Sequence, residues 1–292
     1  MSGATSRHAL AAHTSAAGTP PRRQPALLVG ALLTGLLLAT ALLSLVWTPH
    51  PPAQQFVRAR LAPPSANHWL GTDAYGHDVL SQLMVGAQSA VLVGVVAVAI
   101  GMVFGVLLGL LAAARKGWVE ELIMRAADLT FAFPAILMAI MLRAVYGSGV
   151  VISIVAIGIA SIPVFARITR ATANALWQRD FVTAARACGR GPWAITREHI
   201  LPNLMPILIV QATIQFAIAI LAEAALSYLG LGTQYPTPSW GRMLSEAQSL
   251  LAMAPLLALF PGLAIALSVF GLNLLGDGLR DRLDPKLREI RT

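Results

Sequence analysis

The side chains that could do chemistry in this sequence are few, and several of them gather in one polar stretch. Within residues 48–84, four side chains offer imidazole or carboxylate donors, the groups that bind transition metals: His68, Asp73, His77 and Asp78. Their spacing is irregular, and Gly71 and Gly76 interrupt any helix that could align them. The pattern therefore favours ordinary polar residues at a membrane interface, and we predict no metal site.

Patterns for other catalytic or cofactor sites are missing from the sequence. A phosphate-binding loop requires Gly-x-x-x-x-Gly-Lys followed by Ser or Thr, but the only lysines are Lys116 and Lys286, and neither follows a glycine. Gly-x-Ser-x-Gly and His-Glu-x-x-His are also absent, which argues against a membrane enzyme. The single cysteine, Cys188, excludes an internal disulfide. We predict a chain that is not an enzyme and holds no cofactor of its own.

Three ionisable residues fall within apolar runs, where a charge is costly and usually faces a cavity or a partner: Asp128, Arg143 and Glu223. Arg143 lies one helical turn before Gly147, and Glu223 about two turns before Gly230, which places both in the outer half of a bundle. One interpretation pairs Arg143 with Glu223, or extends Arg143 to the outer interface. The other places these residues along a translocation path, against the charged end of a peptide. Both stay open at this point.

The elements that must position these side chains are membrane helices. The chain has 292 residues, of which 57% are hydrophobic and 12% are charged, whereas a soluble domain has about 25% charged residues. Its mean hydropathy is +0.70. Because a spanning helix needs about 20 apolar residues, six spans can be drawn, at about 26–47, 85–113, 127–147, 149–166, 204–230 and 252–275.

These spans predict an all-α polytopic membrane protein with a single six-helix domain. The domain covers residues 25–275, between a disordered tail at 1–24 and a C-terminal tail at 276–292. Of the 21 lysines and arginines, 17 fall in the two tails and in the loops around 114–126 and 167–203. Since cytoplasmic loops hold the excess of Lys and Arg, we expect both termini in the cytoplasm. The placement of the net charge of +8 thus indicates the topology of a membrane protein rather than a nucleic-acid partner. We expect this protein in the inner (plasma) membrane.

The loop at 167–203 carries a helical pattern of its own. Asp180 is a good N-cap, and one helix face is shared by Phe181, Ala184, Ala185 and Cys188. Arg179, Arg186 and Arg190 lie elsewhere on this helix. Gly189 can end it in a left-handed C-cap, Pro192 can begin a second short helix, and Pro202 is expected to stop that second helix. Two short helices are expected to meet at a glycine corner.

Such a hairpin suits either a protein groove or a lipid surface. Small residues allow another backbone to approach closely, and the arginines could pair with acidic groups of a partner. Alternatively, the helix rests on the inner leaflet with its arginines on lipid phosphates. The sequence of this loop resembles the coupling loop of ABC importer permeases. The residues that carry the resemblance are Thr183, Ala184 and Ala185, followed by Gly189 and by Ile200-Leu201-Pro202. That pattern begins with glutamate where this chain has Thr183.

Two further stretches resemble the peptide and nickel branch of these permeases. They are His68-Trp-Leu-Gly-Thr-Asp73 with Gly76-His-Asp-Val-Leu-Ser81, and Leu272-Asn-Leu-Leu-Gly-Asp277-Gly-Leu-Arg280-Asp-Arg-Leu-Asp284-Pro285. The resemblance covers about residues 25–290 and is closest to the C-type permease of oligopeptide or dipeptide importers. His77 stands where that branch has arginine.

The resemblance implies one half of a heteromeric translocation pathway. Expected partners are a homologous permease, one or two ABC ATPase subunits or a fused pair that bind ATP and Mg, an extracytoplasmic peptide-binding protein, and membrane lipid. The ATPases would contact Asp180, Phe181, Ala184, Ala185, Arg186, Gly189 and Arg190, and the binding protein the outer segment at 232–250, which includes Tyr235 and Trp240. Import of nickel or another small solute, and a self-contained secondary transporter, stay open as alternatives.

Overall fold

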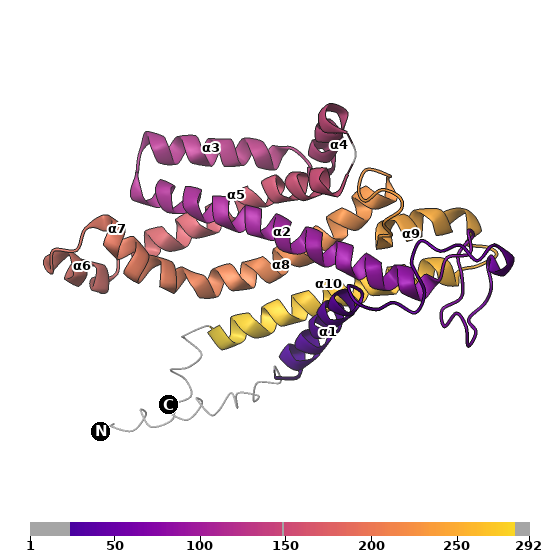
Figure 1. Ribbon diagram of the computed structural model, residues 1–292. Coiled ribbons are helices and arrows are strands. Elements are labelled where there is room, and N and C mark those ends of the chain that lie inside the picture. Colours follow the sequence, from indigo (N-terminus) through magenta and orange to yellow (C-terminus); the bar gives the residue numbers. More distant parts are fainter. Residues whose placement is uncertain (1–23, 148, 284–292) are drawn as a thin grey trace, which may run out of the picture.

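The computed structural model describes residues 24–147 and 149–283, and these residues form an elongated helical bundle (Figure 1). The long helices are α1 (Gln24–Leu43), α2 (Val79–Ala114), α5 (Val150–Leu176), α8 (Leu201–Tyr228) and α10 (Leu256–Leu283). The shorter helices are α3 (Trp118–Ala132), α4 (Ala135–Tyr146), α6 (Asp180–Ala187), α7 (Pro192–Ile195) and α9 (Trp240–Ala247). A π-helical segment, η2 (Thr196–Ile200), joins α7 to α8. The 3-10 turns η1 (Val57–Ala59) and η3 (Gln248–Leu250) complete the elements.

Five helical runs in the described part of the chain are long and apolar enough to cross a membrane. They are α1, α2, α5, the continuous run Pro192–Tyr228 and α10. Helices α3 and α4 make a sixth candidate if they form one span, because they are bent by 86° where the helix breaks before Ala135. Pro134 lies at this break. Its ring removes a backbone donor and disfavours helix at the preceding residue, which explains why the helix is interrupted here. The predicted all-helical membrane architecture is confirmed, and the region predicted as the third span, 127–147, folds as parts of two helices bent at a break.

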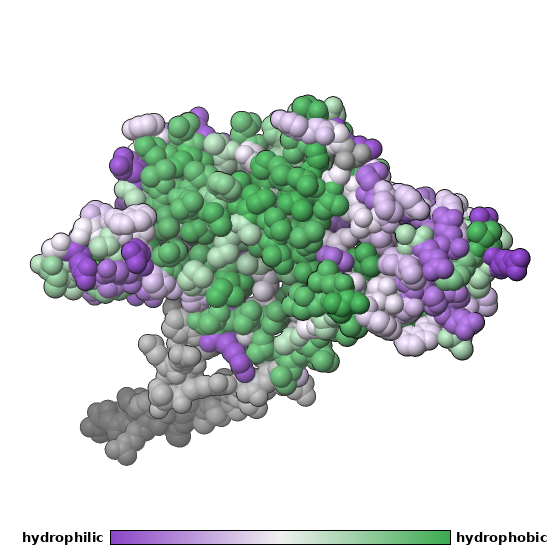
Figure 2. Space-filling view, viewed as in Figure 1, coloured by the Kyte–Doolittle hydropathy of each residue, from purple (hydrophilic) through white to green (hydrophobic). Residues whose placement is uncertain are grey.

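The distribution of polarity along the bundle matches a membrane-embedded protein. Apolar side chains cover its middle, and polar side chains gather at its two ends (Figure 2). One end is formed by α6 and α7, and the opposite end by α9 and the chain that precedes α2 (Figure 1). The structure thus has a hairpin end and an α9 end, separated by the apolar belt.

Several helices run further than the sequence predicted. Helix α5 extends to Leu176 rather than ending near 166, so the loop begins later than residue 167. Helix α10 continues to Leu283 although a tail was expected from 276 onward, and Pro261 lies within it. Hydropathy marks only the apolar part of a helix, and a polar turn that follows without a breaker continues the same backbone hydrogen bonds. The predicted tail at 1–24 and the rest of the C-terminal tail lie outside the described residues, apart from Gln24.

Helix α2 is packed most closely against α5. A row of glycines at every fourth residue of α2, namely Gly101, Gly105 and Gly109, lies against α5. A Cβ atom at Gly105 would lie 2.5 Å from the Cβ of Phe165 and 2.7 Å from the carbonyl oxygen of Ile162. Small residues at this spacing let two membrane helices approach closely, because van der Waals packing replaces the hydrophobic effect between helices in lipid.

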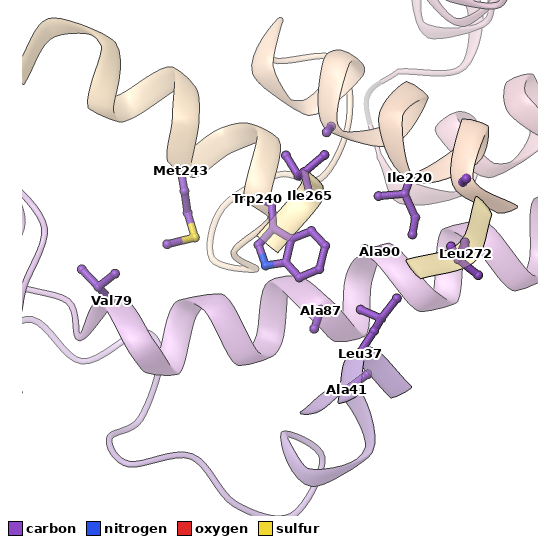
Figure 3. Packing of buried hydrophobic residues seen from close by; sticks show 12 residues of the cluster. Leu37, Ala41, Val79, Ala87, Ala90, Ile220, Trp240, Met243, Ile265 and Leu272 are labelled. Carbon is purple, nitrogen blue, oxygen red and sulfur yellow. The ribbon is translucent and has the colours of Figure 1, made fainter. Parts of the chain in front are cut away.

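Helix α9 is held to the bundle by a buried tryptophan. Trp240 is 4% exposed, packs with Ala87 and Ala90 of α2, and donates from Nε1 to the carbonyl oxygen of Leu83 at 3.0 Å (Figure 3). The expectation that Trp240 meets an external binding protein is therefore wrong, because its ring is buried against α2 of its own chain. Tyr235 of the same segment is 61% exposed.

Candidate functional site

The hairpin predicted within the 167–203 loop is present as α6 and α7. Helix α6 begins at Asp180, with Arg179 at the N-cap and no side-chain capping bond from it. Asp180 is thus the first residue of the helix, not its N-cap as predicted. Its carboxylate still lies in the first turn, where a negative charge is favourable beside the helix dipole. Thr183 is therefore not three residues after the N-cap, and a glutamate there could not complete a capping box with Asp180.

The glycine corner forms as predicted. Gly189 has a φ of +78°, in the left-handed region that favours glycine. Its N–H donates to the carbonyl of Arg186 at 2.9 Å, and the N–H of Arg190 donates to the carbonyl of Ala185 at 3.1 Å. This pair of bonds is a Schellman motif, which satisfies the last carbonyls of α6. Pro192 then begins α7 at its first turn, as predicted.

The second helix does not stop at Pro202. The chain continues from α7 through the π-helical segment η2 into α8, and Pro202 lies in the first turn of α8. A π segment places its hydrogen bonds one residue further along the chain, so the N–H of Leu201 donates to the carbonyl of Thr196. The widened turn accommodates a residue that has no N–H. The hairpin is consequently joined to α8 by continuous helix.

The hairpin is anchored to the bundle by one apolar side. Val182 is fully buried, and it shares a core cluster with Ile195, Ile200 and Phe165 of α5. The predicted apolar face of α6 is not the face that packs inward. Phe181, Ala184 and Cys188 are exposed, and Ala185 is half-buried.

An exposed face of small and apolar side chains therefore remains on the hairpin. We define the hairpin face as Phe181, Ala184, Cys188 and Trp193, all exposed, with Trp193 of α7 78% exposed. Either of the two predicted neighbours, a groove in a partner protein or the lipid surface of the inner leaflet, would cover such a face. The spacing of apolar residues in the sequence predicts that α6 has an apolar face. It does not predict which element packs against that face, or which side of the helix turns inward.

The charged residues of the hairpin are arranged around this face. Arg190 pairs with Glu198 at 3.2 Å, and the guanidinium of Arg186 lies 5.4 Å from the ring centroid of Trp177. These contacts connect the hairpin to its two flanking segments, because Trp177 is the C-cap of α5 and Glu198 lies in η2. The Arg186 and Arg190 side chains are largely exposed, as a surface that meets acidic groups requires.

The three ionisable residues of the apolar runs each have different partners. Glu223 is 1% exposed and accepts hydrogen bonds from Ser227 at 2.7 Å and Thr233 at 3.4 Å. Arg143 donates to the carbonyl of Gly230 instead of pairing with Glu223, so the predicted ion pair is not formed. Asp128 pairs with Arg167 of α5 at 2.6 Å.

The four polar residues near the start of α2 fall into two pairs. His77 lies 2.7 Å from Asp73, and His68 lies 2.9 Å from Asp78. Asp78 is the N-cap of α2 and accepts from the backbone N–H and the hydroxyl of Ser81. Burial raises the pKa of Asp78, but the hydrogen bonds from Ser81 and His68 and the charge of His50 together hold it below its ordinary value. His50, which the sequence analysis missed, also lies beside Asp78.

The bundle and the hairpin together define a multi-pass membrane protein with an exposed hairpin at one end. The model of the family "Binding-protein-dependent transport system inner membrane component" matches residues 105–289. The chain belongs to this family, and it is a permease subunit of the inner membrane. Its own role in an ABC importer is therefore that of the non-catalytic membrane component.

Individual relatives agree with this assignment. The chain is 46% identical over 225 residues to the glutathione transport system permease protein of Pectobacterium atrosepticum, covering 77% of this chain and 75% of that protein. It is 45% identical over 246 residues to a di/tripeptide transport system permease protein of Pseudomonas aeruginosa, covering 82% and 81%. Among solved structures, the inward-facing MetNI methionine ABC transporter has a TM-score of 0.57 at 19% identity, over 70% of this chain and 96% of that one. That similarity shows a shared fold.

Proposed function

We propose that this chain forms half of the translocation pathway of an ATP-driven peptide importer, and that its hairpin receives the motion of separate ATPase subunits. The observation that carries the proposal is the hairpin face, which is exposed on a hairpin whose opposite side is anchored in the core. A docking element must combine these two properties, because a loosely attached loop would move without moving the bundle. In this proposal the hairpin end and both termini are cytoplasmic.

The path of the motion follows from the continuity of the helices. A displacement of α6 acts on Val182, and through it on the core cluster shared with α5 and α8. Helix α7 continues through η2 into α8, so the same displacement also tilts α8 directly. ATP and Mg bind to the ATPase subunits, and a homologous permease supplies the other half of the pathway.

The proposed cargo is a short peptide. The relatives that are about 45% identical are named for glutathione and for di- and tripeptides, and all of these contain peptide bonds. An extracytoplasmic binding protein would deliver the cargo at the α9 end, where Tyr235 is exposed. The alternative cargo is nickel or another small solute. A direct uptake assay with each candidate distinguishes this alternative from a peptide.

Copurification from membranes tests the proposed function. When the chain is expressed with its neighbouring transport genes and isolated through a tag, we expect a second permease and one or two ATPase chains in the same complex. Reconstituted with the binding protein, that complex is expected to take up radiolabelled dipeptide only with ATP. Uptake by this chain alone without an ATPase would contradict the proposal and favour a secondary transporter.

We further propose that Arg143 lines the translocation path, whereas Glu223 and Asp128, which belong to the same predicted set, stabilise helix contacts. Support comes from their partners. The Asp128 and Glu223 carboxylates each meet donors of this chain, while the guanidinium of Arg143 meets only a neutral carbonyl among the described hydrogen bonds and ion pairs. Arg143 thereby keeps its charge for the carboxylate end of a peptide.

Replacing Arg143 by glutamine is expected to lower peptide uptake about 10-fold, since a hydrogen bond to a charged group contributes roughly 1.5–3 kcal/mol. Glu223→Gln keeps hydrogen-bonding atoms for Ser227 and Thr233 and is expected to leave uptake near the wild-type rate. Uptake into proteoliposomes at subsaturating peptide measures both, with complex assembly checked by size-exclusion chromatography. Normal uptake by Arg143→Gln would remove Arg143 from the path, and a loss with Glu223→Gln in an assembled complex would place Glu223 there instead.

A further inference from the structure

Three donor side chains from separate parts of the chain meet at the start of α2. They are His50, His68 and Asp78, and one donor atom from each lies within 4.8 Å of the other two. Oδ1 of Asp78 lies 2.9 Å from Nδ1 of His68 and 3.5 Å from Nδ1 of His50. Metal–ligand bonds of about 2.0–2.1 Å place neighbouring donors roughly 2.9–3.4 Å apart, so the two distances to Asp78 need little adjustment. Two imidazoles with one carboxylate suit zinc and its transition-metal neighbours rather than magnesium or calcium.

A shell of hydrogen bonds holds the three donors in place. The hydroxyl of Ser81 donates to Oδ2 of Asp78 at 2.7 Å and accepts from the backbone N–H of His50 at 3.0 Å, so it links two of the donors. The hydroxyl of Thr48 donates to the carbonyl of His50 at 2.9 Å. The backbone N–H of His68 donates to Ser65 at 3.1 Å. These bonds fix the backbone at His50 and His68 and one oxygen of the Asp78 carboxylate, and so help to position the three donors before a metal binds.

Capping of α2 by itself does not account for His50. The bond between His68 and Asp78 and the bonds to Ser81 explain why those residues are buried. Nδ1 of His50, however, is buried and makes no hydrogen bond in the described structure, and it approaches Oδ1 of Asp78 only to 3.5 Å. A buried nitrogen without a partner costs free energy, and a metal ion bound between it and Asp78 would satisfy it.

We propose that His50, His68 and Asp78 bind one divalent transition-metal ion at the α9 end of the permease. This proposal does not depend on the proposed function. The ion would join the segment after α1, the segment before α2 and the N-cap of α2, with Phe56 packed against both imidazoles at centroid distances of 5.3 and 5.1 Å. Asp73 and His77 pair with each other and are not part of it.

Zinc titration of the full chain tests the site. The protein carries a tag that is not polyhistidine, His8 and His13 are replaced by alanine, and bound metal is removed with EDTA before Zn²⁺ is added. We expect one Zn²⁺ per chain by calorimetry and by elemental analysis after gel filtration. His50→Phe keeps an aromatic ring against Phe56 and leaves the His68–Asp78 bond intact. It is expected to weaken Zn²⁺ binding at least about 10-fold, the loss that even an outer-shell change produces.

His199→Phe is the matched control, because the ring of His199 also packs on an aromatic side chain, with its centroid 6.1 Å from that of Phe181. It should bind Zn²⁺ like the parent protein. Melting curves without metal check that His50→Phe folds, and His50→Gln repeats the test if it does not. Absence of stoichiometric Zn²⁺ binding by the parent, or equal affinity in the parent and the folded His50 variant, would overturn the proposal.

Discussion

Replacing Ala184 by tryptophan is expected to abolish ATP-driven uptake while the permease still folds and inserts. Ala184 is exposed in the hairpin face, between Phe181 and Cys188 on the same side of α6, and it belongs to no core cluster of the described residues. A partner backbone packed against an alanine cannot accommodate an indole ring. Disruption at the centre of an interface costs about 2 kcal/mol or more, which lowers affinity at least roughly 30-fold. The ATPase subunits should therefore be lost when the tagged permease is purified, and uptake should fall with them.

Ala184→Ser provides the control, because it adds one oxygen atom at the same position and should retain both the ATPase subunits and uptake. The Trp variant must elute from size-exclusion chromatography as the parent permease does, which separates lost docking from lost folding. Full ATPase recovery with Ala184→Trp would show that the hairpin face meets lipid rather than a protein. That result would contradict the proposal that the hairpin receives the motion of the ATPase subunits.

The sequence predicted those features of the hairpin that depend on local chemistry. Gly189 ends α6 and Pro192 begins α7 because a positive φ and a missing N–H are properties of single residues. The prediction that Pro202 stops the second short helix was wrong, because the helix continues through a π segment. That outcome depends on how α8 packs against its neighbours, and such packing leaves no periodic trace in one sequence.

Contacts between distant segments were the other part that the sequence could not predict. His50 has no metal-binding spacing with His68 or Asp78, and Ser81 brings it to them across 31 residues. Trp240 was expected outside and is buried against α2. The proposed Arg143–Glu223 pair failed for the same reason, since two charges in one half of a bundle have several neighbours to choose from. Hydropathy predicts depth in a membrane, but it does not predict which helix faces which.

The glycine row of α2 gives the second large expected effect. Gly105→Leu is expected to reduce the yield of folded permease at least about 10-fold, because the new side chain meets the Cβ of Phe165 and the carbonyl of Ile162 at once. Backbone cannot move aside as a flexible side chain can, and overpacking costs roughly 1–3 kcal/mol even where repacking is possible. Expression as a fluorescent fusion, followed by size-exclusion chromatography in mild detergent, measures the folded fraction.

Gly35→Leu on α1 is the matched control, since no atom of the described structure outside its own helix turn lies within 4 Å of a Cβ placed there. Both substitutions raise helix propensity, by up to about 1 kcal/mol, so propensity alone predicts that both variants become more stable. A loss confined to Gly105→Leu would therefore show that the approach of α2 to α5 sets the stability of the bundle. A monodisperse Gly105→Leu protein at the parent yield would contradict this prediction, because it would mean that α2 and α5 can move apart without loss of stability.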